Sequence, residues 1–264
     1  MIDYHTHTSL CGHASGKMED YVKEAVQCGL DELGFSDHLP MKGGKKNNLS
    51  MTLEELPDYV GEVERLRRSF PDICIKLGIE ADYVPGNESS LREILARYQF
   101  DYVIGSVHSI GTWAFDHPDE RDRWDSTDVD NVYANYFDLL RQSARSGLFD
   151  IIGHSDLVKK FGHRCEADLS NELNDTAQVF AKHDVAVEIN TSGLRKPVKE
   201  MYPSKEILTI YQKYNIPIVF GSDAHAPDEV GKDFDKAVLV ARQCGYKGYV
   251  TFEQRERAVC DFLD

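Results

Sequence analysis

Seven short and mainly apolar runs recur along the chain, and stretches with helical spacing separate them. In chain order the runs cover residues 2–5, 33–36, 73–79, 102–107, 150–153, 185–189 and 216–221. Strands that alternate with helices are typical of βα units around a parallel sheet. The pattern therefore predicts an α/β fold in which the seven runs are neighbouring parallel strands.

The stretches between the runs carry apolar residues at helical spacing. One stripe extends from Met18 to Val26 in steps of three and four, and Gly29 follows it as a residue that would end a helix. Similar stripes cover residues 132–140 and 234–241. We interpret these stripes as helix faces that pack on the sheet.

The 264 residues are a normal length for one α/β barrel, so we expect a single domain over residues 1–264. A formal net charge of −15 disfavours binding to nucleic acid or to an anionic membrane. We find neither a long apolar run nor a secretory leader, so we expect a cytoplasmic protein. The six cysteines are scattered, which predicts reduced thiols.

Each run except the sixth ends at, or next to, a side chain that can bind a metal. In chain order these side chains are His5, His7, His38, Glu80, His108, His154, Asp223 and His225. The sixth run ends at Asn190 instead. In barrel enzymes the carboxyl ends of the strands meet at the active site, so the sequence predicts a spatial cluster of donors there.

Local spacing supports this cluster. Residues two apart in an extended segment point to the same side, which pairs His5 with His7 and also Asp223 with His225. His13 follows the first run closely enough to reach the same rim. Asp37 precedes His38, and we expect its carboxylate to orient a metal-binding imidazole. The other three histidines, His117, His163 and His183, are expected to be ordinary surface or core residues.

Nine nitrogen and oxygen donors exceed the four that one tetrahedral zinc site needs, so two or three metals are expected. Imidazole and carboxylate together favour zinc, iron or manganese. With three divalent cations, Glu80 and Asp223 would leave a local charge of about +4. This excess would allow an acidic protein to bind a phosphate dianion.

Seven short motifs contain these donors. In chain order they are His5-Thr-His7, Cys-Gly-His13, Ser-Asp-His38, Gly-Ile-Glu80, Ser-Val-His108, Gly-His154-Ser-Asp and Ser-Asp223-Ala-His225. The set resembles the polymerase and histidinol phosphatase (PHP) superfamily over nearly the whole chain. Residues 188–197 look like the monofunctional histidinol-phosphate phosphatases of that superfamily. The resemblance implies a distorted seven-stranded (β/α)7 barrel, similar to a TIM barrel, with a trinuclear metal site at the carboxyl ends of its strands.

The resemblance also implies a role for each donor. One metal would be held by His5, His7, Glu80 and Asp223, and Glu80 would bridge to a second metal held by His108 and His154. The third would be held by His13, His38 and His225. The implied reaction converts L-histidinol phosphate, a step of histidine biosynthesis, to L-histidinol and phosphate. A hydroxide that bridges two metals would attack phosphorus.

Other residues have expected roles near the metals. Asp156 is a candidate proton donor, and its alternative is a purely structural carboxylate. Arg195 and Arg164 are candidate phosphate ligands because they follow strands of the site, and Asn190 is a further candidate for substrate binding. The nearby Lys159, Lys160 and Lys196 are expected to enrich the positive potential of the same loops.

Four connections are longer than packing requires, and long loops in compact domains are often functional. They cover residues 39–50, 109–126, 155–170 and 191–203. The second contains Trp113, Phe115 and Trp124, which could form a lid or anchor the loop by packing. Oligomeric state is not predicted.

Alternative functions remain open at this stage. A PHP-type phosphoesterase could act on another small metabolite, a nucleotide or a phosphotyrosine protein with the same ligands. An amidohydrolase would also begin with two histidines on a strand, but the order of the nine donors fits it poorly. A non-catalytic metal-binding module would be expected to lack some of the donors, and none is missing.

Overall fold

The computed structural model describes residues 1–40 and 49–262, so most of the long connection at residues 39–50 lies outside it. Seven strands form one sheet whose hydrogen-bonded neighbours follow chain order and are all parallel. They are β1 (Ile2–Asp3), β2 (Glu32–Phe35), β3 (Cys74–Asp82), β4 (Tyr102–Ser106), β5 (Ile151–Ile152), β6 (Ala186–Asn190) and β7 (Ile218–Gly221).

The sheet curls into a nearly closed barrel, as the alternating pattern predicted. The Tyr4 amide, just after β1, donates a hydrogen bond of 2.9 Å to the Phe220 carbonyl of β7. Thr6 and Ala224 continue this contact as an isolated parallel bridge. The first and last strands therefore lie side by side.

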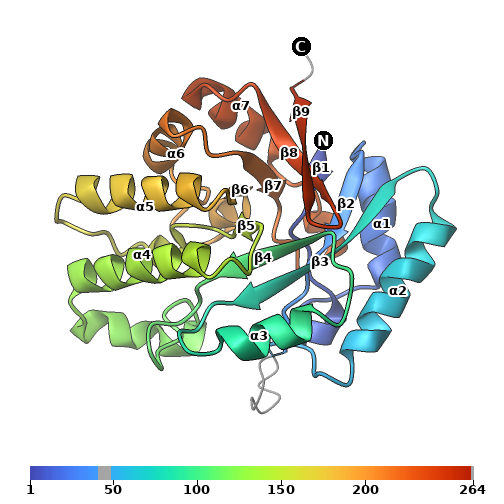
Figure 1. Cartoon of the computed structure of the whole chain (residues 1–264), viewed down its shortest axis with the longest axis horizontal. Coiled ribbons are helices and arrows are strands. Elements are labelled where there is room, and N and C mark those ends of the chain that lie inside the picture. Colours follow the sequence, from blue (N-terminus) through green and yellow to red (C-terminus); the bar gives the residue numbers. More distant parts are fainter. Residues whose placement is uncertain (41–48, 263–264) are drawn as a thin grey trace.

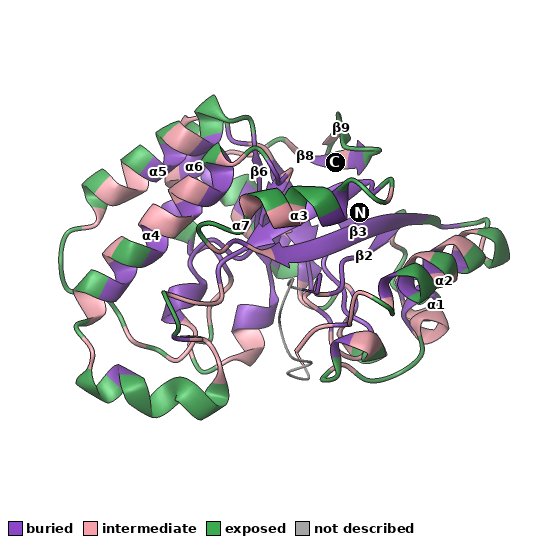
Figure 2. Ribbon diagram, turned by 60° about the horizontal axis from the view of Figure 1, so that its bottom comes forward, coloured by how far each residue is buried: buried purple, intermediate pink, exposed green. Residues whose placement is uncertain are grey.

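In the described part of the chain, seven α-helices surround the strands (Figure 1). They are α1 (Met18–Gln27), α2 (Leu56–Ser69), α3 (Glu88–Leu95), α4 (Val129–Arg145), α5 (Ser170–Lys182), α6 (Lys205–Lys213) and α7 (Phe234–Cys244). Figure 2 shows that each long helix is buried on one side and exposed on the other, whereas β3 is buried along most of its length. The apolar stripes expected to face the core do so. Gly245 ends α7 in a left-handed conformation, with φ of 102°.

A pair of stacked tyrosines fills the barrel between its first strands. The rings of Tyr4 and Tyr102 are 4.5 Å apart, and the Tyr102 hydroxyl donates to the Tyr4 carbonyl at 2.6 Å. Gly34 and Gly78 face Tyr102, and a Cβ atom at either position would overlap its side chain. The two glycines of β2 and β3 thus make room for this core.

A C-terminal hairpin was not predicted from the sequence. β8 (Gly248–Glu253) pairs antiparallel with β9 (Glu256–Asp261). Arg255 in its turn donates to the Asp150 carboxylate at 2.8 Å and to the Leu148 carbonyl at 2.7 Å. Asp150 immediately precedes β5, so the hairpin covers the amino end of the barrel. The carboxyl end remains available for a site.

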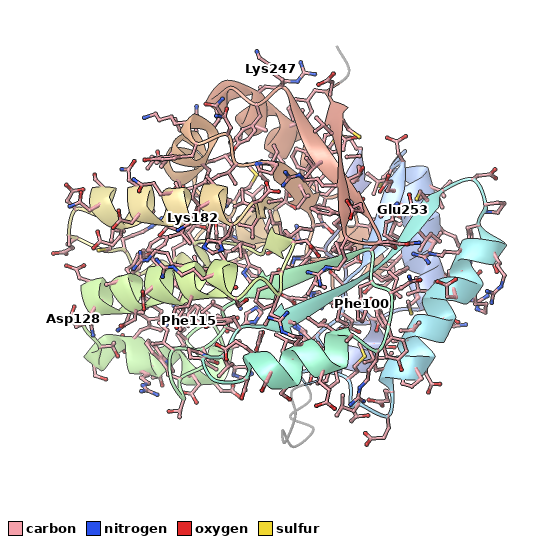
Figure 3. All side chains as sticks on the ribbon, viewed as in Figure 1. Phe100, Phe115, Asp128, Lys182, Lys247 and Glu253 are labelled. Atoms are coloured by element: carbon pink, nitrogen blue, oxygen red, sulfur yellow. The ribbon has the colours of Figure 1, made fainter. Side chains whose placement is uncertain are left out.

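The three aromatic residues of the long loop before α4 are packing anchors. Trp113, Phe115 and Trp124 are each at most 3% exposed. The Trp124 indole donates to the Phe115 carbonyl at 2.8 Å and stacks on His163. Phe115 also packs edge to face on Tyr136 of α4, among the dense side chains seen in Figure 3. The structure therefore favours anchoring over an aromatic lid.

Two further observations concern the chain as a whole. None of the six cysteines is in a disulfide, as their scattered spacing predicted. Among the described residues, no helix combines the length and the apolar character that crossing a membrane would require.

Candidate metal centre

The nine predicted donors converge at the carboxyl end of the barrel. Eight of them belong to strands or to the segments directly after them, and His13 follows the 3₁₀ helix η1 (Ser9–Cys11). The sequence placed the end of the third strand at residue 79, but β3 continues to Asp82. Glu80 therefore lies inside a regular strand, and its side chain is buried in the barrel.

Glu80 stands at the centre of the cluster. Its Oε2 atom lies 2.9 Å from His38 Nδ1 and 3.3 Å from His5 Nε2. Its Oε1 atom lies 3.1 Å from His154 Nε2 and 3.7 Å from His108 Nε2, and it also accepts from Ser106 Oγ at 2.6 Å. The two oxygens thus face two different sets of imidazoles, which is the geometry that a bridging carboxylate requires.

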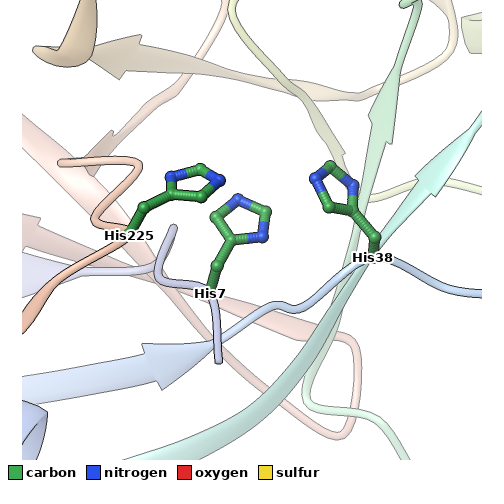
Figure 4. Close-up of side chains that lie close together, drawn as sticks. All are labelled: His7, His38 and His225. Atoms are coloured by element: carbon green, nitrogen blue, oxygen red, sulfur yellow. The ribbon is translucent and has the colours of Figure 1, made fainter. Parts of the chain in front are cut away.

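Asp223 organises the opposite side of the cluster. Its Oδ1 atom lies 3.1 Å from His7 Nε2 and 3.5 Å from His225 Nδ1. The Nε2 atoms of His225 and His13 are 3.0 Å apart. Figure 4 shows the His7 ring between those of His225 and His38, and the ring centroids are 4.2 and 4.4 Å from it.

Three carboxylates hold the outer nitrogen atoms of the imidazoles. His5 Nδ1 lies 2.6 Å from Glu188 Oε1, and His108 Nδ1 lies 2.6 Å from Asp82 Oδ1. His7 Nδ1 lies 3.5 Å from Asp37 Oδ1, in line with the orienting role expected for Asp37. Such partners fix the ring orientation of metal-binding histidines.

Sequence reasoning missed Glu188 and Asp82 as partners. Asp82 lies two residues after Glu80, so the alternation of side chains along β3 could have placed it on the same face. Glu188 interrupts the apolar run of β6 and is 1% exposed, so an acidic residue in a buried strand was the available signal.

The buried charges determine the protonation of the site. Burial opposes a positive charge on His5, but Glu188, Glu80 and Asp223 outweigh it and hold the His5 pKa well above its usual range. Burial likewise opposes ionisation of Glu80, yet the nearby His38 and His5 hold its pKa well below the usual range. The carboxylates are therefore anionic and ready to bind cations.

Several buried atoms of this cluster form no hydrogen bond with the described residues, although charged or ring groups lie close to them. They include His5 Nε2, both nitrogens of His7, and Glu80 Oε2. An unsatisfied buried polar atom costs about 1–3 kcal/mol, so several at one place are unfavourable unless a cation supplies the missing interaction. Four sets of three side chains lie close enough to share an ion: His7, His38 and His225; His5, Glu80 and His154; His5, His7 and Asp223; and His7, Cys11 and Asp37, of which the first three consist of predicted donors only. The site fits divalent metals.

A cavity of about 740 Å³ opens over the donors. Its floor includes Glu80, Asp223 and five of the clustered histidines. Residues 49–54 form part of its wall. The long connections at residues 109–126, 155–170 and 191–203 contribute Asp116, Lys160 and Lys196, in that order. The expectation that these loops contribute to the site is confirmed in that each one lines the cavity.

The four residues predicted as proton donor or substrate ligands lie outside the cavity lining. Asp156 is buried and accepts from Lys159 Nζ at 2.7 Å and from the Ser204 amide at 2.8 Å. Arg164 is half exposed and pairs with Glu200 at 2.8 Å. Asp156 Oδ1 has no hydrogen-bond partner among the described residues, so a proton-donor role and a structural role for Asp156 both stay predictions, as does phosphate binding by Arg164.

Asn190 and Arg195 lie behind the metal donors. Asn190 donates to Asp223 Oδ2 at 3.4 Å and accepts from the Ser192 amide at 2.9 Å, so its side chain supports a donor. Arg195 donates to the Ser222 carbonyl at 2.7 Å and lies 3.2 Å from Glu229. Its Nη1 atom is buried and has no hydrogen-bond partner among the described residues.

Comparison with known families and proteins agrees with this geometry. The family model described as PHP domain matches residues 3–192, and one described as PHP-associated matches residues 205–233. A probable histidinol-phosphatase of Deinococcus radiodurans is 42% identical over 257 residues, which cover 97% of this chain and 98% of that protein. The histidinol-phosphatase of Bacillus subtilis is 26% identical and covers 88% of this chain and 96% of its own length.

A solved structure shares the fold. It is histidinol phosphate phosphatase from Lactococcus lactis, complexed with zinc, L-histidinol and phosphate. Its TM-score is 0.77 at 22% identity, and the match covers 97% of this chain and 98% of that one. At this identity the similarity supports the barrel architecture.

Proposed function

The chain belongs to the PHP domain family, and from this premise we propose that it hydrolyses L-histidinol phosphate to L-histidinol and phosphate with divalent metals. One observation carries the proposal. Glu80, whose buried Oε2 atom has no hydrogen-bond partner among the described residues, lines a cavity together with Asp223 and five of the clustered histidines, and this cavity is large enough for a small phosphate ester. A probable histidinol-phosphatase and a histidinol-phosphatase match 97% and 88% of the chain, respectively.

We further propose three metal positions. His5, His7, Glu80 and Asp223 would hold one, Glu80 with His108 and His154 a second, and His13, His38 and His225 a third. The mixture of imidazole and carboxylate favours zinc, iron or manganese. When bound, such cations lower the pKa of water and neutralise charge on phosphoryl oxygens. Support comes from the two-sided contacts of Glu80 and from the short distance between His13 and His225.

The residues of the chain supply orientation and charge. Glu188 and Asp82 fix the rings of His5 and His108, so that the Nε2 atoms of both rings face Glu80. Lys160 and Lys196 are the basic side chains of the described cavity lining, and we propose that they attract the phosphate dianion. Arg195 remains a candidate through its buried Nη1 atom.

Steady-state turnover across a panel of phosphate esters tests this function, with metal content measured on the same sample. Histidinol phosphate is expected to exceed p-nitrophenyl phosphate, sugar phosphates and nucleotides in kcat/KM by at least about 100-fold, because a buried polar site rejects ligands that leave it unpaired. Equal turnover of all monoesters would indicate a generalist phosphatase. Preferential cleavage of diesters would remove the monoesterase assignment.

A further inference from the structure

One partly buried carboxylate in the cavity makes no direct contact with a metal donor among the described residues. Five carboxylates line the described cavity: Glu54, Glu80, Asp82, Asp116 and Asp223. Glu80 and Asp223 belong to the donor cluster, Asp82 is paired with His108, and Glu54 is exposed. Asp116 instead forms an ion pair of 2.9 Å with Lys160, and both side chains are 17% exposed. The cavity wall therefore presents a positive and a negative group side by side.

The structure fixes this ion pair on two loops. Asp116 follows Phe115, which is buried against Tyr136, so the anchored aromatic residues set its position. Lys160 follows the 3₁₀ helix η3 (Leu157–Lys159), and its carbonyl accepts from the Val198 amide at 3.1 Å. Both groups are thus part of the rigid wall and belong to connections far apart in sequence.

Asp116 is ionised and close to the reacting end of the cavity. Burial opposes its ionisation, but Lys160 and then His108 outweigh burial and hold the Asp116 pKa below its usual range. His154 contributes in the same direction. Asp116 lines the same cavity as His108 and His154, two of the metal donors, so it faces the space in which a phosphate would bind.

We propose that the Lys160–Asp116 pair selects phosphate esters of 2-amino alcohols. Lys160 donates to a phosphate oxygen, and Asp116 accepts from the ammonium group that such an ester carries two carbons from its bridging oxygen. The positive Lys160 thereby meets the negative phosphate, and the negative Asp116 meets the positive ammonium group of the same ligand. Histidinol phosphate belongs to this class, so the inference rests on the proposed function and assigns the recognition of its amino group.

The expected size of the effect follows from the contact. A hydrogen bond to a charged group contributes about 1.5–3 kcal/mol, which corresponds to about 10- to 150-fold in kcat/KM. An ester without the ammonium group leaves Asp116 with Lys160 alone, and Lys160 is then held away from the phosphate. Selectivity for the amino ester should therefore appear in the wild-type enzyme and depend on Asp116.

The test compares histidinol phosphate with its deamino analogue, 3-(imidazol-4-yl)propyl phosphate, in the metal-loaded enzyme. Wild type should prefer the amino ester by about 10- to 150-fold in kcat/KM, and Asp116→Asn should lower this ratio to within about threefold of unity. Asp119→Asn is a matched control, since Asp119 lies on the same loop and its side chain is 91% exposed. It should keep the wild-type ratio. Metal content and melting temperature are measured for each variant.

Each outcome separates the two proposals. If wild type cleaves both esters equally well, or if Asp116→Asn keeps the full preference, the amino-group contact is wrong while histidinol-phosphate hydrolysis stands. If wild type cleaves p-nitrophenyl phosphate but not histidinol phosphate, the proposed function itself is wrong. Should Asp116→Asn not fold, the wild-type ratio of the two esters still decides, because a ratio near one overturns the inference.

Discussion

The Glu80 carboxylate connects two groups of histidines that come from opposite sides of the barrel. One oxygen faces His5 and His38, and the other faces His108 and His154. Because Glu80 is the negative charge shared by both groups, its removal leaves neither of them complete.

Glu80→Ala is therefore expected to lose at least one equivalent of metal and to abolish turnover. Metal analysis of protein purified without chelator, together with kinetics on the same sample, measures both effects. Glu206→Ala is a matched control, because this glutamate is exposed on α6. Full activity of Glu80→Ala, or of wild type freed of metal, would contradict the metal centre.

Arg195 differs from the other predicted substrate ligands because its Nη1 atom is buried and still lacks a described partner. If Nη1 contacts phosphate, Arg195→Met should reduce kcat/KM by about 10- to 150-fold, which is the contribution of a charge-assisted hydrogen bond. Metal content should stay unchanged, and Arg195→Lys should recover part of the loss.

The alternative role of Arg195 gives a different result. Its contacts with Ser222 and Glu229 border the segment that carries Asp223 and His225. If Arg195 only supports that segment, Arg195→Met would lose metal together with activity. If Arg195→Met keeps both the kinetics and the metal content of the wild type, Arg195 neither binds phosphate nor supports the segment. Phosphate binding would then belong to Lys160, Lys196 and the metals.

The β8–β9 hairpin closes the barrel at the end opposite to the metal donors. Arg255 connects its turn to Asp150 and to the Leu148 carbonyl. This hairpin was not predicted, because its strands are only partly buried and their burial does not alternate regularly. We therefore expect the hairpin to contribute to the free energy of unfolding and not to the catalysed reaction.

Arg255→Ala is expected to lower the free energy of unfolding by about 1–2 kcal/mol, at the lower end of charged hydrogen bonds because the side chain is 37% exposed. Urea denaturation measures this loss. Arg257→Ala is the control, because its partner Asp184 is 78% exposed and the pair should contribute little. Since neither arginine lines the described cavity, kcat/KM should not change in either variant. A fall in turnover at constant stability would contradict the purely structural role of the hairpin.

Across the whole molecule, the metal cluster links stability to pH. In the metal-free protein, burial lowers the pKa of His7 and His108, but carboxylates overcome it and raise the values to about 9 and about 10. Because these values exceed the usual 6.5, protonation stabilises the metal-free fold fully below about pH 6.5. This stabilisation is lost as pH rises through the raised pKa values.

Metals compete with those protons, so the two forms should respond to pH in different directions. The melting temperature of the metal-loaded protein should exceed that of the chelated protein, and the difference should grow between about pH 6.5 and 9. Calorimetry of metal binding at pH 7 in buffers of different ionisation enthalpy should also detect proton release. A pH-independent difference in melting temperature, without proton release, would contradict this linkage.

The sequence by itself determined the seven strands, their parallel order and the nine donors at their ends. Strand periodicity is a local property, and parallel strands bring their carboxyl ends to one side whatever their loops do. Tertiary structure decided which groups meet: Glu188 with His5, Lys160 with Asp116, and Arg164 with a surface carboxylate. Those pairings depend on how far each strand continues and on how long loops pack against distant helices. Contacts of this kind are set by the whole fold, and no short stretch of sequence records them.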